Sequence, residues 1–515
     1  MHRVSRQPSI VLLVLLSIAT AAHAQHDYKV SRNLIRKGEY EQALKILMQR
    51  ITKYPDDSEW VYQRAIARAL VQTPLQAQEA LTRAHEMGVP SGRIAADARD
   101  LLAPIQKTPA LRKIFQTQRN RPVQGPMLGD LTHASVRIWM RTAQPAEVGV
   151  RIAGVEDTPS AKTTVQSDLT AVLHVKGLTP NRDYTYEILI DGKLVKLPQS
   201  THFRTRPAPG DPVKFSFAFG GGAGYVTKHE HMWDTIGAEN PDALFLLGDN
   251  MYSDDPESLR MQRFCYYRRQ SPAPFRKLVV RTPVYSIWDD HDFGTNDCSG
   301  GPDVDVPAWK IPVWNVFRQN WANPGYGGGV QQPGCWYDFT VGDIHFIMLD
   351  GRYYRHRKDN TMLGPAQKAW LKQTLVKNKA TFTVIASPVP WEYRTKGDSK
   401  DTWNGFKDER AEIFDFLAER KIEGVLLISA DRHRSDAWKI DRPNSYPLYE
   451  FNSSRLTNNH VHGEMKAALF SYNKKQSFGL VEFDTTGDDP IVRYTVINID
   501  GERMHSLELK RRELQ

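Results

Sequence analysis

One short stretch most constrains what this chain can fold into: an apolar run that ends abruptly in four consecutive ionisable residues. Val284 to Trp288 has the character of a buried strand, and Asp289 to Asp292, an Asp-Asp-His-Asp sequence, follows it directly. Carboxylates and imidazole are ligands for hard and borderline metal ions, and the end of a strand fixes their direction. The stretch therefore predicts a metal site at a sheet edge. The alternative is a solvated, Asp-rich turn.

Other predicted strands end in a similar way. Leu244 to Leu247 runs into Gly248-Asp249-Asn250-Met251-Tyr252, and Val425 to Ser429 runs into Ala430-Asp431-Arg432-His433. Phe215 to Phe219 ends instead in a Gly-rich loop, and the sequence between these strands predicts a hairpin at 336–349, a helix at 367–377 and a strand at 382–386. Strands that present acids and histidines at their carboxyl ends are typical of an α/β domain with its site along those ends.

The N-terminus resembles a secretory signal peptide. Met1 to Arg6 is basic, Ile10 to Ile18 is almost entirely apolar, and Ala22-His23-Ala24 is a small-x-small cleavage signature. The apolar core is too short to span a membrane, and no other stretch approaches that length. We therefore predict a signal peptide at 1–24, cleavage near Ala24, and a secreted or periplasmic mature chain. The net charge of +9 suits an anionic substrate, while no Lys/Arg run is dense enough to indicate nucleic-acid binding.

Residues 25–118 are predicted to form a small helical module. Apolar residues fall at helical spacing, and Lys37-Gly38-Glu39-Tyr40 before Ala43-Leu44 looks like part of a tetratricopeptide repeat. An independent solenoid needs at least three such repeats, more than this segment offers. We therefore expect a tetratricopeptide-like module that packs on the next domain or on a protein partner.

Residues 119–208 change period. Residues 135–141, 147–152 and 184–190 alternate polar and apolar, which indicates an antiparallel β-sandwich. Leu178 to Tyr186 looks like the corner of a fibronectin type III-like sandwich, in which a Tyr closes the turn. Residues 209–515 then form the α/β domain.

The chain has three cysteines, Cys265, Cys298 and Cys335, and export would permit a disulfide. We expect a bond between Cys298 and Cys335, because both flank Gly-rich turns around the predicted site. The sequence contains no Cys-x-x-Cys pair, which argues against a structural zinc knuckle.

Five motifs in order resemble those of the alkaline phosphatase D family, within the calcineurin-like binuclear metallophosphoesterases. They are Gly-Asp-x-x-Tyr (Gly248, Asp249, Tyr252), Trp-Asp-Asp-His-acid (Trp288 to Asp292), Leu-Asp-x-Arg (Leu349, Asp350, Arg352), Gln-x-x-Trp-Leu (Gln367, Trp370, Leu371) and Ser-x-Asp-x-His (Ser429, Asp431, His433). The resemblance covers about residues 120–500, without the helical module. It implies an α/β metallophosphoesterase sandwich of mixed sheets flanked by helices, and a metal-dependent phosphatase or phosphodiesterase acting on a small phosphate ester.

By position, the resemblance also implies a set of metal ligands: Asp249, Tyr252, Asp290, Asn296, Asp431 and His433. Asp249 would bridge two ions, and Asp290 and Asn296 are alternatives for the second. A metal-bound hydroxide would attack phosphorus while His291 protonates the leaving alkoxide. Arg352 would contact substrate oxygens, or alternatively pair with a surface carboxylate.

The chain departs from the family at the first motif. The family's metals are iron and calcium, and a Cys after the first strand binds the iron, but here Gly220-Gly221-Gly222-Ala223-Gly224 takes that place. Either Tyr225 or His231 substitutes, or water fills the position, or one of the two metal ions binds weakly. Two alternatives to an enzyme follow: a phosphate- or glycan-binding protein with a decayed metal site, and an interaction scaffold acting through the helical module.

Overall fold

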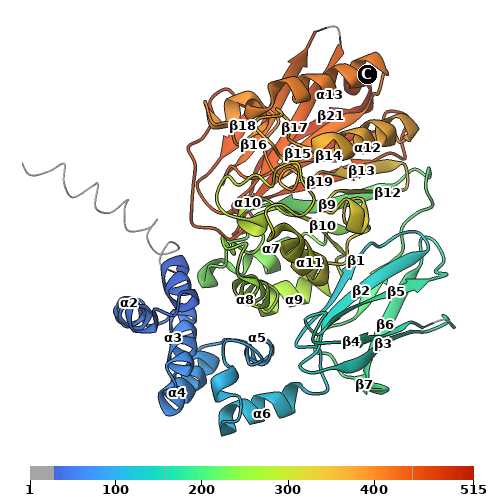
Figure 1. The fold of residues 1–515 in the computed structure, drawn as a ribbon. Helices are drawn as coiled ribbons and strands as arrows, with labels where there is room; N and C mark the ends of the chain where they lie inside the picture. The colour runs from blue at the N-terminus through green and yellow to red at the C-terminus, as the bar shows by residue number, and fades with distance from the viewer. Residues whose placement is uncertain (1–27, 157, 444) are drawn as a thin grey trace, which may run out of the picture. The chain divides into compact units, whose positions relative to one another are not determined.

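The computed structural model describes residues 28–156, 158–443 and 445–515 (Figure 1). The predicted signal peptide lies outside the described residues. The chain divides into two compact units, of which the first ends at Val89 and the second comprises Pro90–Gln515. Among the helices of the described part of the chain, none is both long and apolar enough to cross a membrane.

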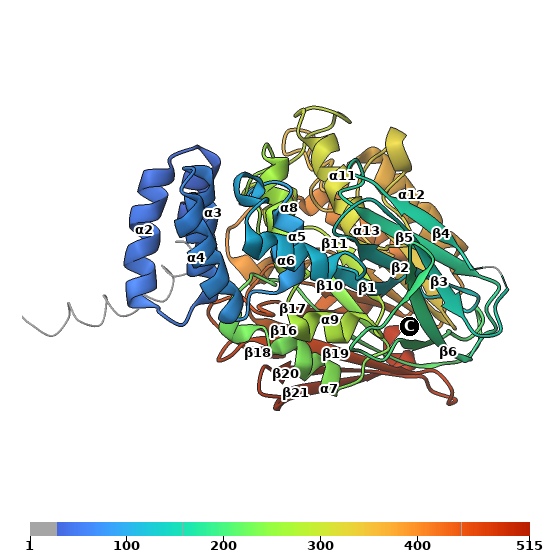
Figure 2. The same ribbon diagram turned by 90° about the horizontal axis from the view of Figure 1, so that it is seen from below.

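The first unit is helical. It contains residues 28–36, α2 (Tyr40–Lys53), α3 (Ser58–Leu70) and α4 (Pro74–Glu86), and the last three lie side by side in Figure 2. The Asp57 carboxylate caps α3 by accepting the backbone N–H of Glu59, and Pro74 starts α4 at a position where a missing N–H costs little. The residues of α2 at the predicted helical spacing are buried. Its likeness to a tetratricopeptide repeat stays a prediction.

Two helices beyond Val89, α5 (Ser91–Asp97) and α6 (Pro109–Gln118), belong to the second unit. The division therefore falls earlier than the predicted domain boundary at residue 118. The reason is packing: α5 contacts α8 (Leu259–Arg269), and Ala95 and Ala96 share a buried cluster with Val123 and Tyr267. These helices link the segment before the β-sandwich to the α/β domain.

The all-β segment is a pair of antiparallel sheets. One has the order β1-β2-β5, and the other has the order β4-β3-β6-β7 with β8 paired to β6. Their bounds are β1 (Gln124–Gly129), β2 (Ser135–Arg141), β3 (Ala146–Ile152), β4 (Ser160–Thr163), β5 (Thr170–Lys176), β6 (Asp183–Ile190), β7 (Lys193–Val195) and β8 (His202–Arg204). Alternate side chains of both sheets form one buried cluster, and the Tyr184 hydroxyl accepts the N–H of Thr179, closing the predicted corner. The fibronectin type III-like assignment stays a prediction.

Two larger sheets form the rest of the second unit. The six-stranded sheet has the order β11-β10-β9-β19-β20-β21, and the seven-stranded sheet has the order β12-β13-β14-β15-β17-β16-β18. The first comprises β9 (Lys214–Gly220), β10 (Ala243–Leu247), β11 (Val284–Ile287), β19 (Ser477–Asp484), β20 (Ile491–Asn498) and β21 (Arg503–Lys510). The second comprises β12 (Tyr337–Val341), β13 (Ile344–Met348), β14 (Phe382–Ala386), β15 (Val425–Ser429), β16 (Ser435–Arg442), β17 (Ser445–Ser453) and β18 (Phe470–Tyr472). The predicted hairpin and strands are therefore present.

Aromatic side chains fill the space between these sheets. Phe217 of β9 stacks on Phe245 of β10 at 4.3 Å between ring centroids, and Phe346 of β13 meets both rings edge-on at 5.6 and 5.2 Å. Full burial of each ring stabilises the fold by about 1.5–3 kcal/mol. Because the sheets are also covered by helices, central strands such as β10 are buried throughout and read as continuous apolar runs.

The helices of this α/β part connect the strands. They are α7 (Met232–Ala238), α8, α9 (Ala273–Val279), α10 (Asp290–Phe293), α11 (Lys310–Asn320), α12 (Gly364–Lys377) and α13 (Lys407–Glu419). At the strand ends the two sheets meet, because Gly221, just after β9, forms a parallel bridge with Ser454, just after β17. Loops from both sheets therefore converge at one edge.

Candidate metal centre

The pairing of β10 with β11 brings two of the predicted strand endings together. Leu247 lies opposite Ile287 in parallel register, so Gly248 follows beside Trp288, and Asp249 and Asp289 come next on the two strands. Gly248 has φ +101°, and a Cβ there would lie 2.5 Å from the Cβ of Asp289, so only glycine fits. The turn continues with Asp249 at φ 55° and Tyr252 at φ 53°, and the Tyr252 hydroxyl donates to Asp249 Oδ2 at 3.0 Å. Such left-handed residues mark a tightly constrained turn.

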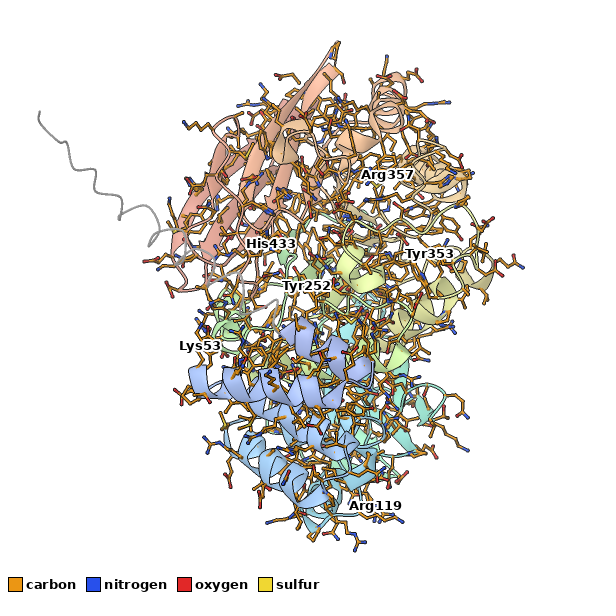
Figure 3. All side chains as sticks on the ribbon, turned by 60° about the vertical axis from the view of Figure 1, so that its left-hand side comes forward. Lys53, Arg119, Tyr252, Tyr353, Arg357 and His433 are labelled. Atoms are coloured by element: carbon orange, nitrogen blue, oxygen red, sulfur yellow. The ribbon has the colours of Figure 1, made fainter. Side chains whose placement is uncertain are left out.

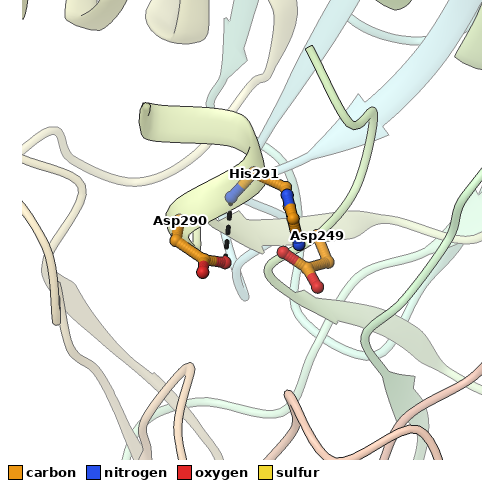
Figure 4. Close-up of side chains that lie close together, drawn as sticks. All are labelled: Asp249, Asp290 and His291. Carbon is orange, nitrogen blue, oxygen red and sulfur yellow. Dashed lines mark hydrogen bonds between the residues drawn. The ribbon is translucent and has the colours of Figure 1, made fainter. Parts of the chain in front are cut away.

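Three predicted site residues, Asp249, Asp290 and His291, each offer a ligand atom within 4.8 Å of the others (Figure 4). Asp249 Oδ1 is buried and has no hydrogen-bond partner among the described residues. Burial raises the pKa of Asp249 well above its usual range; His291 opposes this and Asp290 adds to it. A buried, partnerless carboxylate oxygen beside a second carboxylate fits a metal cation, which would supply the missing partner.

The last acid of the Asp-Asp-His-Asp stretch organises the turn. Asp292 accepts the backbone N–H groups of Asn250 and Met251 at 2.8 and 3.0 Å, and the Asn250 amide donates to the carbonyl of Ile287. Burial raises the pKa of Asp292 to about 6, and these N–H groups hold it down from a higher value. Asp292 and Asn250 therefore position Asp249 and Tyr252 instead of facing the cluster.

His291 is held by an acid that was not singled out in the sequence. Its Nδ1 lies 2.5 Å from Asp254 Oδ1, and its ring stacks on Tyr252 at 4.7 Å. Burial lowers the pKa of His291, but Asp290, Asp249 and the hydrogen bond to Asp254 more than offset this and raise it well above 6.5. The place of Asp254, two residues after Tyr252 in the same turn, was the available sequence signal. With Nδ1 engaged, Nε2 is the nitrogen left for substrate or metal.

The third strand ending belongs to the other sheet, and its predicted ligands Asp431 and His433 are not part of the Asp249–Asp290–His291 group. Asp431 and His433 follow β15 at φ 65° and 41°, and His433 Nδ1 is buried without a hydrogen-bond partner among the described residues. Burial, with His460 and His462, lowers the pKa of His433 well below 6.5, which keeps the imidazole in its metal-binding neutral form. Figure 3 labels His433 and Tyr252, and the Asn458 amide donates to the Tyr252 hydroxyl at 2.6 Å, joining the two sides of the site.

Arg352 is enclosed by acids, which favours the alternative of a carboxylate partner over the expected contact with substrate. Its side chain is fully buried. Nε donates to Asp289, and the two terminal nitrogens bind the Asp401 carboxylate at 2.7 and 3.0 Å. Burial opposes the charge of Asp401, but Arg352 and Arg355 lower its pKa below the usual range. For Asp289, burial outweighs the effect of Arg352 and raises the pKa to about 7. Arg352 therefore holds the acids behind the site in place.

Of the alternatives Asp290 and Asn296, the structure brings only Asp290 into the cluster. Asn296 is exposed, and the neighbouring Asp297 donates its backbone N–H to Asp290 Oδ2 at 2.6 Å. A second acidic group, Asp290, Asp297 and Asp401, is already compensated by Arg352 and by Lys396, whose Nζ lies 3.4 Å from Asp401. The first cluster is therefore the stronger metal candidate.

The two side chains proposed to replace the missing first-motif ligand point elsewhere. Tyr225 packs under the guanidinium groups of Arg93 and Arg268, at 5.7 and 5.2 Å from its ring. His231 is exposed at the start of α7, and its Nδ1 binds the carbonyl of Lys228. Neither contributes to the cluster.

The expected Cys298–Cys335 disulfide is wrong, because both cysteines are free thiols. The Cys298 thiol donates to the carbonyl of Asp290 at 3.8 Å, while Cys335 is buried beside Asp350, which accepts its backbone N–H at 2.9 Å. Each sulfur is packed against a different part of the site, so the shared Gly-rich surroundings did not indicate proximity.

Comparison with known proteins agrees with this geometry. The PhoD-like phosphatase domain matches residues 217–491, and a domain of unknown function (DUF7800) matches residues 120–208. The alkaline phosphatase D of Bacillus subtilis (strain 168) is 25% identical over 320 residues, which are 51% of this chain and 53% of that protein. The chain thus spans about half the length of this curated relative.

Two solved structures share the fold. The structure of PhoD superposes with a TM-score of 0.64 and 18% identity, covering 75% of this chain and 89% of PhoD. A purple acid phosphatase from yellow lupin (Lupinus luteus) seeds superposes with a TM-score of 0.56 and 14% identity, covering 76% of each chain. The mixed sheets and helices are thus those of a metallophosphoesterase-like α/β fold. The match to the PhoD-like phosphatase domain covers more than half of this chain, and the chain therefore belongs to the PhoD-like phosphatase family.

Proposed function

We propose that this protein is a metal-dependent phosphoric ester hydrolase of the alkaline phosphatase or phosphodiesterase type, with two metal ions in its site. The observation that carries the proposal is the Asp249–Asp290–His291 cluster with its partnerless Asp249 Oδ1, in a chain of the PhoD-like family. The likeness to alkaline phosphatase D supports a small phosphate ester as substrate.

The proposed metal ligands come from both sheets: Asp249, Tyr252, Asp290, Asp431 and His433. Asp249 follows β10, an inner strand of the six-stranded sheet, and by its place in the motif would hold both ions. Bound cations supply positive charge that attracts the phosphoryl group and makes a water molecule acidic enough to act as nucleophile. Asp292, Asn250 and Arg352 contribute by fixing the turns that carry the ligands.

His291 is the proposed general acid. Asp254 holds its Nδ1, and the surrounding carboxylates keep the ring protonated near neutral pH. Stacking on Tyr252 fixes the plane of the ring, so that Nε2 can deliver its proton to the leaving alkoxide. The Asp254 carboxylate stabilises the imidazolium and restricts its orientation.

Lys396 replaces Arg352 as the cation proposed to contact substrate oxygens. Its side chain is 17% exposed, and its Nζ lies 3.4 Å from the proposed ligand Asp431. An ammonium group on a flexible stem can turn toward an arriving phosphate, whereas the enclosed guanidinium of Arg352 cannot do so without losing its ion pair with the buried Asp289.

The test is turnover of p-nitrophenyl phosphate, bis(p-nitrophenyl) phosphate and pyrophosphate by chelator-stripped protein, before and after reloading with divalent or ferric ions. We expect hydrolysis of a monoester or diester only after reloading. Metal-loaded protein that binds phosphate without hydrolysing any of these compounds would overturn the proposal in favour of a binding protein.

Export and a protein partner are further parts of the proposal. The basic, apolar and small-x-small pattern of residues 1–24 supports secretion or a periplasmic location. The helical first unit supports an interaction role, because helical hairpins of this type commonly present a binding face. Cleavage after Ala24, read by N-terminal sequencing of the exported protein, tests the first point.

A further inference from the structure

Two glycines of the loop after β9, Gly221 and Gly222, leave no room for a side chain such as the family's cysteine. A Cβ at Gly221 would lie 2.6 Å from the Cβ of Ala430 and 3.0 Å from the carbonyl oxygen of Gly248. Gly222 has φ +67°, and a Cβ there would lie 3.0 Å from the backbone nitrogen of Arg455. A side chain at either of these two positions would therefore clash with Ala430 or with the backbone of Arg455.

That segment is the loop after β17, residues 454–462. The N–H groups of Arg455 and Leu456 both donate to the carbonyl of Gly221, at 3.0 and 3.1 Å. Those of Thr457 and Asn458 donate to the carbonyl of Gly222, at 3.3 and 3.1 Å. These four hydrogen bonds, from consecutive N–H groups to two glycine carbonyls, hold the loop against the Gly-rich turn. Two histidines follow in the same loop.

These histidines, His460 and His462, lie beside the proposed ligand His433. Their Nε2 atoms are 3.2 Å apart, and the ring centroids of the three histidines are 4.6, 5.0 and 5.4 Å apart. Nitrogen ligands on a tetrahedral zinc ion at 2.0–2.1 Å would be about 3.3 Å apart, with ring centroids about 5 Å apart. The two Nε2 atoms lie within hydrogen-bond distance of each other, and the same spacing is close to that of two ligands on one ion.

Hydrogen bonds outside the triad prepare these rings for metal. His462 Nδ1 donates to the carbonyl of Arg432 at 3.0 Å, so the neutral ring has its lone pair on Nε2, facing His460. The backbone N–H of His460 donates to Asn458, whose amide binds the Tyr252 hydroxyl. His433 Nδ1 is buried and partnerless among the described residues.

We propose that His460 and His462, with His433, form an imidazole ligand set for one metal ion, in place of the first-motif cysteine. The inference rests on the proposed function, since it completes the second metal position of that site. In the structure the nitrogen atoms of the three rings do not all lie within 4.8 Å of one another, so binding of one ion by all three would require the rings to approach each other. Imidazole ligands without thiolate favour a divalent ion such as Zn²⁺, Co²⁺ or Ni²⁺ over thiolate-bound iron.

The test compares the full-length protein with the double variant His460→Gln/His462→Gln and a matched control, His202→Gln, an exposed histidine of β8. After equilibration with zinc and removal of excess, elemental analysis should find one equivalent fewer in the double variant than in wild type and control. Competition with a chromogenic chelator should show affinity for that ion reduced at least ~100-fold. Cobalt-substituted wild type should show d–d bands without thiolate charge transfer.

Metal content and affinity equal to wild type in a folded double variant would overturn the inference, whatever the turnover. If the wild-type protein nevertheless hydrolyses phosphate esters, the proposed function stands without the triad. Metal loss in the double variant, together with a metal-loaded but inactive wild type, would support the triad and remove the proposed function.

Discussion

Replacing Arg352 distinguishes a residue that supports the site from one that binds substrate. The Arg352→Met variant keeps the apolar stem and removes the charge that Asp289 and Asp401 share. Breaking a buried ion pair by removing one partner costs about 3–5 kcal/mol, because it leaves an uncompensated buried charge. For a unit of the size of Pro90–Gln515, unfolding entropy is about 0.9 kcal/mol per kelvin, so the melting temperature should fall by about 4 °C.

The loss should depend on pH in a defined direction. Arg352 lowers the pKa of Asp401 in the folded protein, so this pair stabilises the fold above the unfolded pKa of about 3.9. That stabilisation disappears as the pH falls through the lower, folded pKa. The part of the difference in unfolding free energy that comes from Asp401 should therefore be full above about pH 4 and shrink in more acidic solution. The part that comes from Asp289 should add to it as the pH rises through about 7, where this carboxyl ionises beside Arg352.

The assay is urea and thermal unfolding at several pH values, with kcat and KM measured on the same samples. Arg357→Met is the matched control, because Arg357 is exposed and should change stability by no more than about 0.5 kcal/mol (Figure 3). Wild-type stability of Arg352→Met at pH 7, combined with a raised KM, would refute the supporting role and restore the substrate contact.

Three further outcomes are expected. Asp249→Asn should lower both metal content and turnover, because it removes charge from a bridging ligand; full occupancy with wild-type rates would contradict that role. His291→Ala should retain its metal ions yet lose about 10²–10⁴-fold in turnover, with a smaller loss for nitrophenyl esters, whose leaving group needs no proton. Loss of metal in that variant would instead identify His291 as a ligand. Mass spectrometry of unfolded, unreduced protein should find Cys298 and Cys335 alkylated, whereas iodoacetamide at pH 8 should label native Cys298 slowly, since burial raises its pKa to about 12. A mass showing both cysteines unlabelled would contradict the free thiols.

The strand endings were predictable because their signals are local. A buried parallel strand is a short apolar run, and the Gly248 turn requires glycine, so Asp249, Tyr252 and Asp290 could be located from the sequence. Parallel pairing then brings such endings to one edge of the sheet. The positions of the acids at the strand ends therefore predicted where the carboxylates would gather.

Features that depend on distant segments could not be predicted in the same way. The burial of Arg352 is decided by Asp401, which lies 49 positions later, so its motif alone suggested a substrate contact. The contribution of residues 454–462 depends on backbone contacts with Gly221 and Gly222, which no side-chain pattern records. Likewise, α5 and α6 continue the helical pattern of the first unit, yet the packing of α5 on α8 and of α6 on α5 assigns them to the second.

Stepwise reconstitution of stripped protein tests the central claim most directly. Metal content and hydrolysis of bis(p-nitrophenyl) phosphate and p-nitrophenyl phosphate would be measured together as metal is added in fractions of an equivalent. If hydrolysis requires two bound ions, we expect negligible turnover up to one equivalent of metal, followed by an increase in turnover that saturates at two equivalents. Full turnover in protein shown by elemental analysis to contain no metal, or no turnover of either ester with two ions bound, would contradict it.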